Sequence, residues 1–156
     1  MVGRRVAILV AFLALLSAQQ AVASDEDAAA VQGTSYFTIT PCRLVDTRGP
    51  LGGPALTAGE KRIYTAVGSC AIPPGAVAIA VNLVVVQPAT GGLARMYAGN
   101  TPTPPAVVLT FSAGQIRANN AIVQLATDAS GTIALENFSG GNADFVIDVF
   151  GYFACG

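Results

Sequence analysis

The chain has 156 residues, of which 53% are hydrophobic and only 11% are charged, and its formal net charge is −1. It contains no histidine and no tryptophan, so the commonest general base and metal ligand and the largest aromatic ring are both missing. The small negative charge disfavours nucleic acid as a partner, because phosphate binding needs a surplus of lysine and arginine. From the sequence we expect no metal ion and no cofactor.

The chain begins with the basic stretch MVGRR, an apolar run from Val6 to Leu16 and the small-residue motif AVA. This order is typical of a secretory signal peptide, and the run is too short to span a bilayer. We expect residues 1–23 to be removed by general secretion, with the twin-arginine route left open by Arg4 and Arg5. The predicted product is secreted, extracellular or at the cell surface, and has no membrane span.

Residues 24–33 are acidic and rich in alanine, without an apolar face to bury, so we expect them to form a mobile tail. A single domain is predicted for residues 34–156, where short β-branched and aromatic runs are separated by glycine, proline and asparagine. These runs predict strands near residues 36–40, 62–67, 76–86, 93–98, 106–111, 121–126, 132–137 and 143–153.

Two of these runs alternate in a way that assigns their core faces. One core face is predicted to hold Val77, Ile79, Val81, Leu83 and Val85, and the other Phe145, Ile147, Val149 and Phe153. The opposite face of the first run is also largely apolar, which predicts a central strand covered on both sides. The segments QPATGG, TDASG and SGGNA favour three hairpins. Together these patterns predict an all-β fold, an antiparallel β-sandwich of jelly-roll type with about eight strands.

The three cysteines, Cys42, Cys70 and Cys155, suit the oxidising compartment that export implies. One disulfide and one remaining thiol are expected, and the spacing alone allows three pairings. A zinc site is the weaker alternative, because the cysteines are scattered and no histidine accompanies them.

Several motifs occur in a fixed order: FTITPCRLVDTR, GGPALTAGEKR, CAIPPGAVAIAVNLVVV, LTFSAGQIRANNAIVQL and DFVIDVFGYF. Their arrangement resembles a widespread bacterial family of secreted β-domains, whose members begin with TP-[AC]-R-L-x-D-T-R and end in D-V-x-G-Y-F. The resemblance covers residues 36–153 and implies a non-catalytic module. It also implies that Cys42 pairs with Cys70, which leaves Cys155 free or linked to another molecule.

Asp46 and Arg48 are the first candidate site. They lie two residues apart and so point to one side of an extended segment, where they can form a charge-assisted pair. A structural clasp is the favoured interpretation, and a binding role for Arg48 is the alternative. Catalysis by Asp46 is disfavoured, since neither a histidine nor a placed second carboxylate accompanies it.

Asn82 and Asn119 are polar residues at positions where the pattern predicts burial. We expect them to bond to backbone groups, with a ligand-facing pair as the alternative. Tyr97 and Asn100 lie in the proline-rich segment MYAGNTPTPP, which has the composition of a modest sugar-contact loop as well as of an ordinary well-pinned one.

The sequence therefore predicts a non-enzymatic interaction module outside the cell, with an extracellular polysaccharide or a surface protein as partner and weak carbohydrate affinity. The alternative function is structural. A chain of high apolar content and low charge could self-associate into a filament or sheath, through strand edges, the N-terminal segment or Cys155.

Overall fold

The computed structural model describes residues 33–156, so the predicted signal peptide and all but the last residue of the predicted tail lie outside the described residues. The described part contains eight strands and no helix. The strands are β1 (Thr34–Asp46), β2 (Lys61–Thr65), β3 (Ala76–Val86), β4 (Gly92–Ala98), β5 (Leu109–Phe111), β6 (Ile116–Gln124), β7 (Thr132–Ser139) and β8 (Asp144–Cys155). Within residues 33–156, no helix has the length and apolar character needed to cross a membrane.

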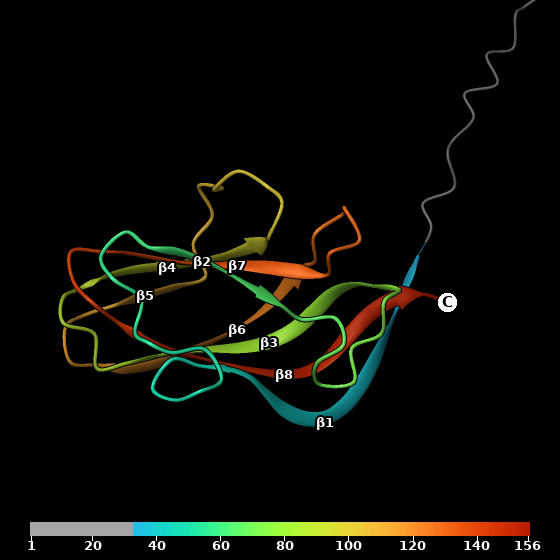
Figure 1. Ribbon diagram of the computed structural model, residues 1–156, viewed down its shortest axis with the longest axis horizontal. Helices are drawn as coiled ribbons and strands as arrows, with labels where there is room; N and C mark the ends of the chain where they lie inside the picture. The colour runs from blue at the N-terminus through green and yellow to red at the C-terminus, as the bar shows by residue number, and fades with distance from the viewer. Residues whose placement is uncertain (1–32) are drawn as a thin grey trace, which may run out of the picture. The chain divides into compact units, whose positions relative to one another are not determined.

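The strands form two antiparallel sheets that face each other as two layers (Figure 1). The first sheet has the order β1-β8-β3-β6 and the second the order β2-β7-β4-β5. Because almost every connection passes from one sheet to the other, the chain winds around a single core as in a jelly roll. The predicted all-β sandwich is confirmed.

The three predicted hairpins are wrong. The segments QPATGG, TDASG and SGGNA connect β3 to β4, β6 to β7 and β7 to β8, and each connection joins strands of different sheets. Among the described strands, β4 and β5 are the only consecutive pair that is hydrogen-bonded. A glycine-rich turn specifies that the chain reverses, but not whether the two strands then pair or separate into opposite layers.

The core lies between the sheets and is built from alternate residues of each strand. Ile79, Leu83, Phe145 and Ile147 are fully buried there, as the alternation predicts. Val77 and Phe153 do not follow it, because β3 and β8 shift register between Ala76 and Ala78 and again between Ala80 and Val81. Each such irregularity turns the following side chains to the other face of the sheet.

Strand β3 is central within its sheet, between β8 and β6, but only one of its faces is covered. Its core-facing residues are buried, whereas Ala80, Asn82, Val84 and Val86 on the other side are only half-buried. The prediction that this strand is covered on both sides is therefore wrong. The face of the first sheet that points away from the core, called the outer face below, remains open to solvent at β3 and β6.

Candidate functional site

The outer face carries a groove beside two aromatic side chains. The groove has a volume of about 450 Å³, and Tyr36 of β1 and Phe150 of β8 stand along it. Its other lining residues come from β3 and β6, and are Ala80, Val81, Asn120, Ala121 and Ile122. Tyr36 is 45% exposed and Phe150 is 39% exposed, so both rings offer apolar surface to a ligand.

The ring of Tyr36 is held in place by its neighbours. It packs against Phe153, with 5.0 Å between the ring centroids. It also lies against the backbone of Gly151, where a Cβ atom would come within 2.5 Å of the Tyr36 hydroxyl oxygen. Glycine at position 151 therefore allows the aromatic ring to lie flat on the strand, and the groove exists before any ligand arrives.

A row of polar residues crosses the four strands next to the groove. In register order it runs from Arg43 through Asp148 and Asn82 to Asn120. Arg43 binds Asp148 with two hydrogen bonds, of 2.8 Å from Nε and 3.2 Å from Nη2. The side chains of Asn82 and Asn120 make no hydrogen bond with any of residues 33–156, so their amide groups can bond to a ligand. Asn119 differs, because its amide donates to the carbonyl of Val108 at 2.7 Å.

At the end of β1, Asp46 is held by two arginines. Arg48 donates to both carboxylate oxygens, from Nε at 2.9 Å and Nη2 at 2.8 Å, and its backbone N–H adds a third bond of 3.1 Å. Arg43 approaches the same carboxylate at 3.3 Å. The side-chain hydrogen bonds from Arg48 lower the pKa of Asp46 to about 2, against the opposing effect of desolvation. The pair forms the charge-assisted contact that its spacing predicts, and its partners are intramolecular.

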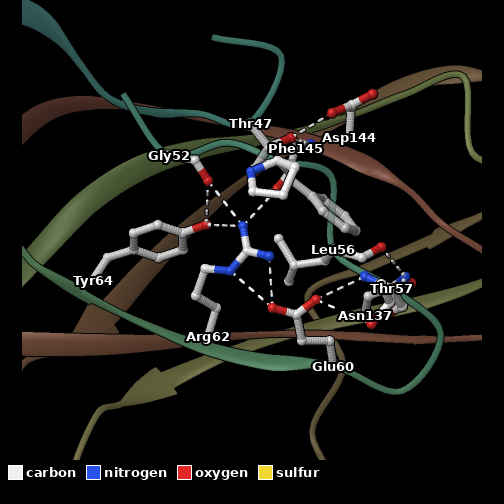
Figure 2. Close-up of polar contacts among 11 residues, drawn as sticks. Thr47, Gly52, Leu56, Thr57, Glu60, Arg62, Tyr64, Asn137, Asp144 and Phe145 are labelled. Carbon is white, nitrogen blue, oxygen red and sulfur yellow. Dashed lines mark hydrogen bonds and ion pairs between the residues drawn. The ribbon is translucent and has the colours of Figure 1, made fainter. Parts of the chain in front are cut away.

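A second polar cluster fixes the long connection between β1 and β2 (Figure 2). The guanidinium of Arg62 donates to the carbonyls of Gly52 at 2.9 Å and Pro54 at 2.6 Å, and pairs with Glu60 at 2.6 Å. Burial raises the pKa of Glu60, but hydrogen bonds from the Thr57 backbone and from Arg62 outweigh it and leave a net lowering. The charged groups of Arg62 and Glu60 thus bond to each other and to backbone groups of the connection between β1 and β2.

Asn137 is completely buried beside this cluster and joins three separate segments. Its side-chain nitrogen donates to the carbonyls of Leu56, Thr57 and Gly141 at 3.1, 3.0 and 2.9 Å. Sequence reasoning did not single out this residue as structural, because its acceptors lie up to 81 positions away in the chain. The only local signal is an asparagine within the otherwise strand-like run TIALENFS.

The second sheet also carries charged residues on its outer side, but they contact one another. Arg95 pairs with Glu136 at 3.4 Å and stacks on the ring of Phe138. The hydroxyl of Tyr97 bonds to Thr103 at 2.8 Å, and only 7% of Tyr97 is exposed. Asn100 bonds to Thr127 in the neighbouring turn. The structure thus places Tyr97 and Asn100 in contacts that pin the loop after β4, and it does not bring them to the groove.

Cys42 and Cys70 form a disulfide with 5.5 Å between their Cα atoms, so the predicted pairing is present. Cys155 is a free, exposed thiol near the end of β8, opposite Thr34 of β1. Within residues 33–156, no three histidine, cysteine, aspartate or glutamate side chains gather in a way that could hold a metal ion.

One residue of the groove carries a signal in the sequence. Phe150 falls out of phase with Phe145, Ile147 and Val149, so alternation places its aromatic ring on the solvent side of the strand. Comparison with known proteins finds no family model that matches the chain and no significant match among curated proteins.

Proposed function

We propose that this domain is a non-catalytic interaction module that acts outside the cell and binds a neutral polysaccharide weakly through the outer face of the first sheet. The proposal depends on one observation, the groove lined by Tyr36, Phe150 and Asn120, where the amides of Asn82 and Asn120 have no hydrogen-bond partner among residues 33–156.

The chemistry of the groove suits a sugar chain. The C–H faces of sugar rings are apolar and pack against exposed aromatic rings, while their hydroxyl groups need neutral donors and acceptors such as amides. A shallow groove with two rings and few hydrogen bonds supports low affinity, because little of the ligand is removed from water. The charged groups nearest the groove, Arg43 and Asp148, already neutralise each other, which favours an uncharged ligand.

A non-catalytic role is supported by the state of the carboxylates. Asp46, Glu60 and Asp148 are each bound to arginine, and hydrogen bonding lowers the pKa of Asp46 and Glu60. A carboxylate with a lowered pKa is a poor general acid at neutral pH. The disulfide is compatible with the oxidising environment outside the cell.

Binding can be tested on a glycan array and on insoluble cellulose and chitin, followed by titration of any soluble ligand that is found. We expect Phe150→Ala to weaken binding about tenfold, the effect of losing roughly 1.4 kcal/mol. Asn120→Ala should weaken it less, by the value of one hydrogen bond. Leu51→Ala is the matched control, because Leu51 is 56% exposed but is not among the residues that line the groove.

Either of two results would overturn the proposal: no binding to any neutral glycan at millimolar concentration, or equal binding by the Phe150→Ala variant and the wild-type protein. Thermal unfolding of each variant shows whether a loss of binding reflects a loss of folding.

A further inference from the structure

The two sheets have four edge strands, and three of these edges are protected against pairing with another strand. Strand β1 contains Pro41, two register shifts and the disulfide at Cys42. Strand β5 is only three residues long, and β2 is five residues long and begins with Lys61 and Arg62. Proline, irregular register, short length and charge are the usual features that keep an edge from pairing.

Strand β6 has none of this protection except one charge. It is nine residues long, and its register with β3 is continuous from Ile116 to Gln124. It contains no proline and no glycine, and Arg117 is its one charged residue. A long regular edge of this kind presents a row of backbone N–H and C=O groups that can pair with an added strand.

The side chains of β6 are open to solvent as well. The first five residues of the strand are all exposed, and Ile116 and Ile122 are 69% and 68% exposed. These two isoleucines point to the outer face, in register with Val86 and Ala80 of β3. On the face where an added strand would continue the sheet, the edge therefore presents the apolar Ile116, Ala118 and Ile122 together with the polar Asn120 and Gln124.

From this geometry we propose that β6 pairs with β6 of a second copy, antiparallel and around a twofold axis at Asn120. In an antiparallel pair, residues opposite each other share a face, so a strand that pairs with its own copy must be centred on a residue. Asn120 is the middle residue of β6, and centring there pairs the whole strand.

This register makes the strand complementary to itself. Ile122 of each copy lies opposite Ala118 of the other, so these apolar side chains cover one another on the outer face, while Ile116 lies opposite the polar Gln124. Arg117 lies opposite Val123. The two copies of Arg117 are then roughly 20 Å apart along the strands, beyond the screening length of about 8 Å at physiological salt.

A second copy fits this edge better than an unrelated strand because, in a twofold dimer, both copies use the same edge and no further edge of this kind is left exposed. The twofold pairing joins the two first sheets into one eight-stranded sheet, whose remaining edges are the protected β1 strands. The expected product is a dimer and not a filament. The interface is small, at the low end of specific interfaces, so we expect a Kd between about 1 µM and 1 mM. The pairing does not depend on the proposed glycan binding.

The dimer can be tested by sedimentation equilibrium in a Cys155→Ser background, which removes disulfide-linked dimers. Ala118→Glu and Ile122→Lys should each weaken the dimer about tenfold. Combining them should restore it, since the two new charges face each other across the axis, whereas within one chain they are about 13 Å apart. Leu51→Lys is the control that leaves dimerisation unchanged, because Leu51 lies outside β6.

The register has a separate test by oxidative cross-linking. A cysteine faces its own copy only at the centre, so Asn120→Cys should form a disulfide-linked dimer much faster than Ala118→Cys or Ile122→Cys. A wild-type protein that is monomeric at about 1 mM overturns the proposal. The proposal is also overturned if the double variant dimerises no more tightly than the weaker of the two single variants. Equal rates of cross-linking at positions 118, 120 and 122, or growth into filaments, would overturn it as well.

Discussion

Because Asn137 is buried, changing its side-chain amide should lower the free energy of unfolding, and the aspartate variant should lose more stability than the alanine variant. In Asn137→Ala, the carbonyls of Leu56, Thr57 and Gly141 lose the two amide N–H groups that they share. None becomes unpaired, since each also accepts a second bond, from the Ala143 N–H, the Glu60 N–H and the Ser139 hydroxyl respectively. Because the amide has two N–H hydrogens for these three carbonyls, the equivalent of two hydrogen bonds is lost, at about 1 kcal/mol each or about 2 kcal/mol in total.

The substitution Asn137→Asp separates the role of the amide from its volume. Aspartate has nearly the same shape, but it places a carboxylate oxygen where the nitrogen now donates to three carbonyls. Without a donor, the buried charge and the carbonyls repel each other, so we expect the aspartate variant to be less stable than the alanine variant at pH 7.

The assay is urea unfolding at 25 °C, supported by thermal unfolding, where a loss of about 2 kcal/mol corresponds to a fall in Tm of about 7 °C for a domain of this size. Asn119→Ala is the matched control, since this amide also donates to a carbonyl but is exposed, and it should cost less than 1 kcal/mol. A stable Asn137→Asp variant, or equal losses at positions 137 and 119, would refute the reasoning.

Three further predictions concern the other polar contacts. The low pKa of Asp46 means that its contribution to stability, about 1 kcal/mol after solvent screening, is present above pH 4 and lost as the pH falls through about 2. Asp46→Asn should remove that pH dependence, as measured by Tm between pH 2 and pH 5, and an unchanged pH profile would contradict it. Replacing both Cys42 and Cys70 by serine should lower the free energy of unfolding by roughly 3 to 4 kcal/mol in urea titrations, because the disulfide joins residues 28 positions apart and restricts the unfolded chain. A loss below 1 kcal/mol would contradict this entropic explanation. Arg62→Lys should cost about 2 kcal/mol and speed proteolysis of the connection before β2, because a compact ammonium lacks the planar fork whose Nη1 bonds the two carbonyls while Nε and Nη2 bond Glu60. Resistance to proteolysis equal to that of the wild type would contradict this role of Arg62.

The sequence predicts the strands well because each one is a local pattern. β-branched residues and alternation identify β3 and β8, and the order of apolar runs is sufficient to predict a sandwich. The predicted boundaries are less accurate at β1, which continues to Asp46 and does not end near residue 40, and at β6, which begins at Ile116 and not near residue 121. The run IRANN is polar and exposed, so it carries little apolar signal even though it is fully paired with β3.

The sequence does not predict which strands pair or which residues meet. The turns before β4, β7 and β8 are tight, yet they cross between layers, because burial of both apolar sheet faces determines the arrangement. The charge pair of Asp46 with Arg48 was predictable from a spacing of two residues. The contacts of Asn137 and the pairing of Arg43 with Asp148 were not, because they join segments far apart in the chain.

The disulfide has a mechanical consequence for a molecule held at one end and pulled at the other. Thr34 and Cys155 lie opposite each other at the end of the β1–β8 ladder. A force that pulls these two residues apart would therefore break the hydrogen bonds between β1 and β8 one after another. When the opening reaches Cys42, the load passes through the sulfur bridge to Cys70. Residues 43–69 then carry no tension, and the braced connection that holds Arg48 and Arg62 stays folded until β3 itself is pulled away.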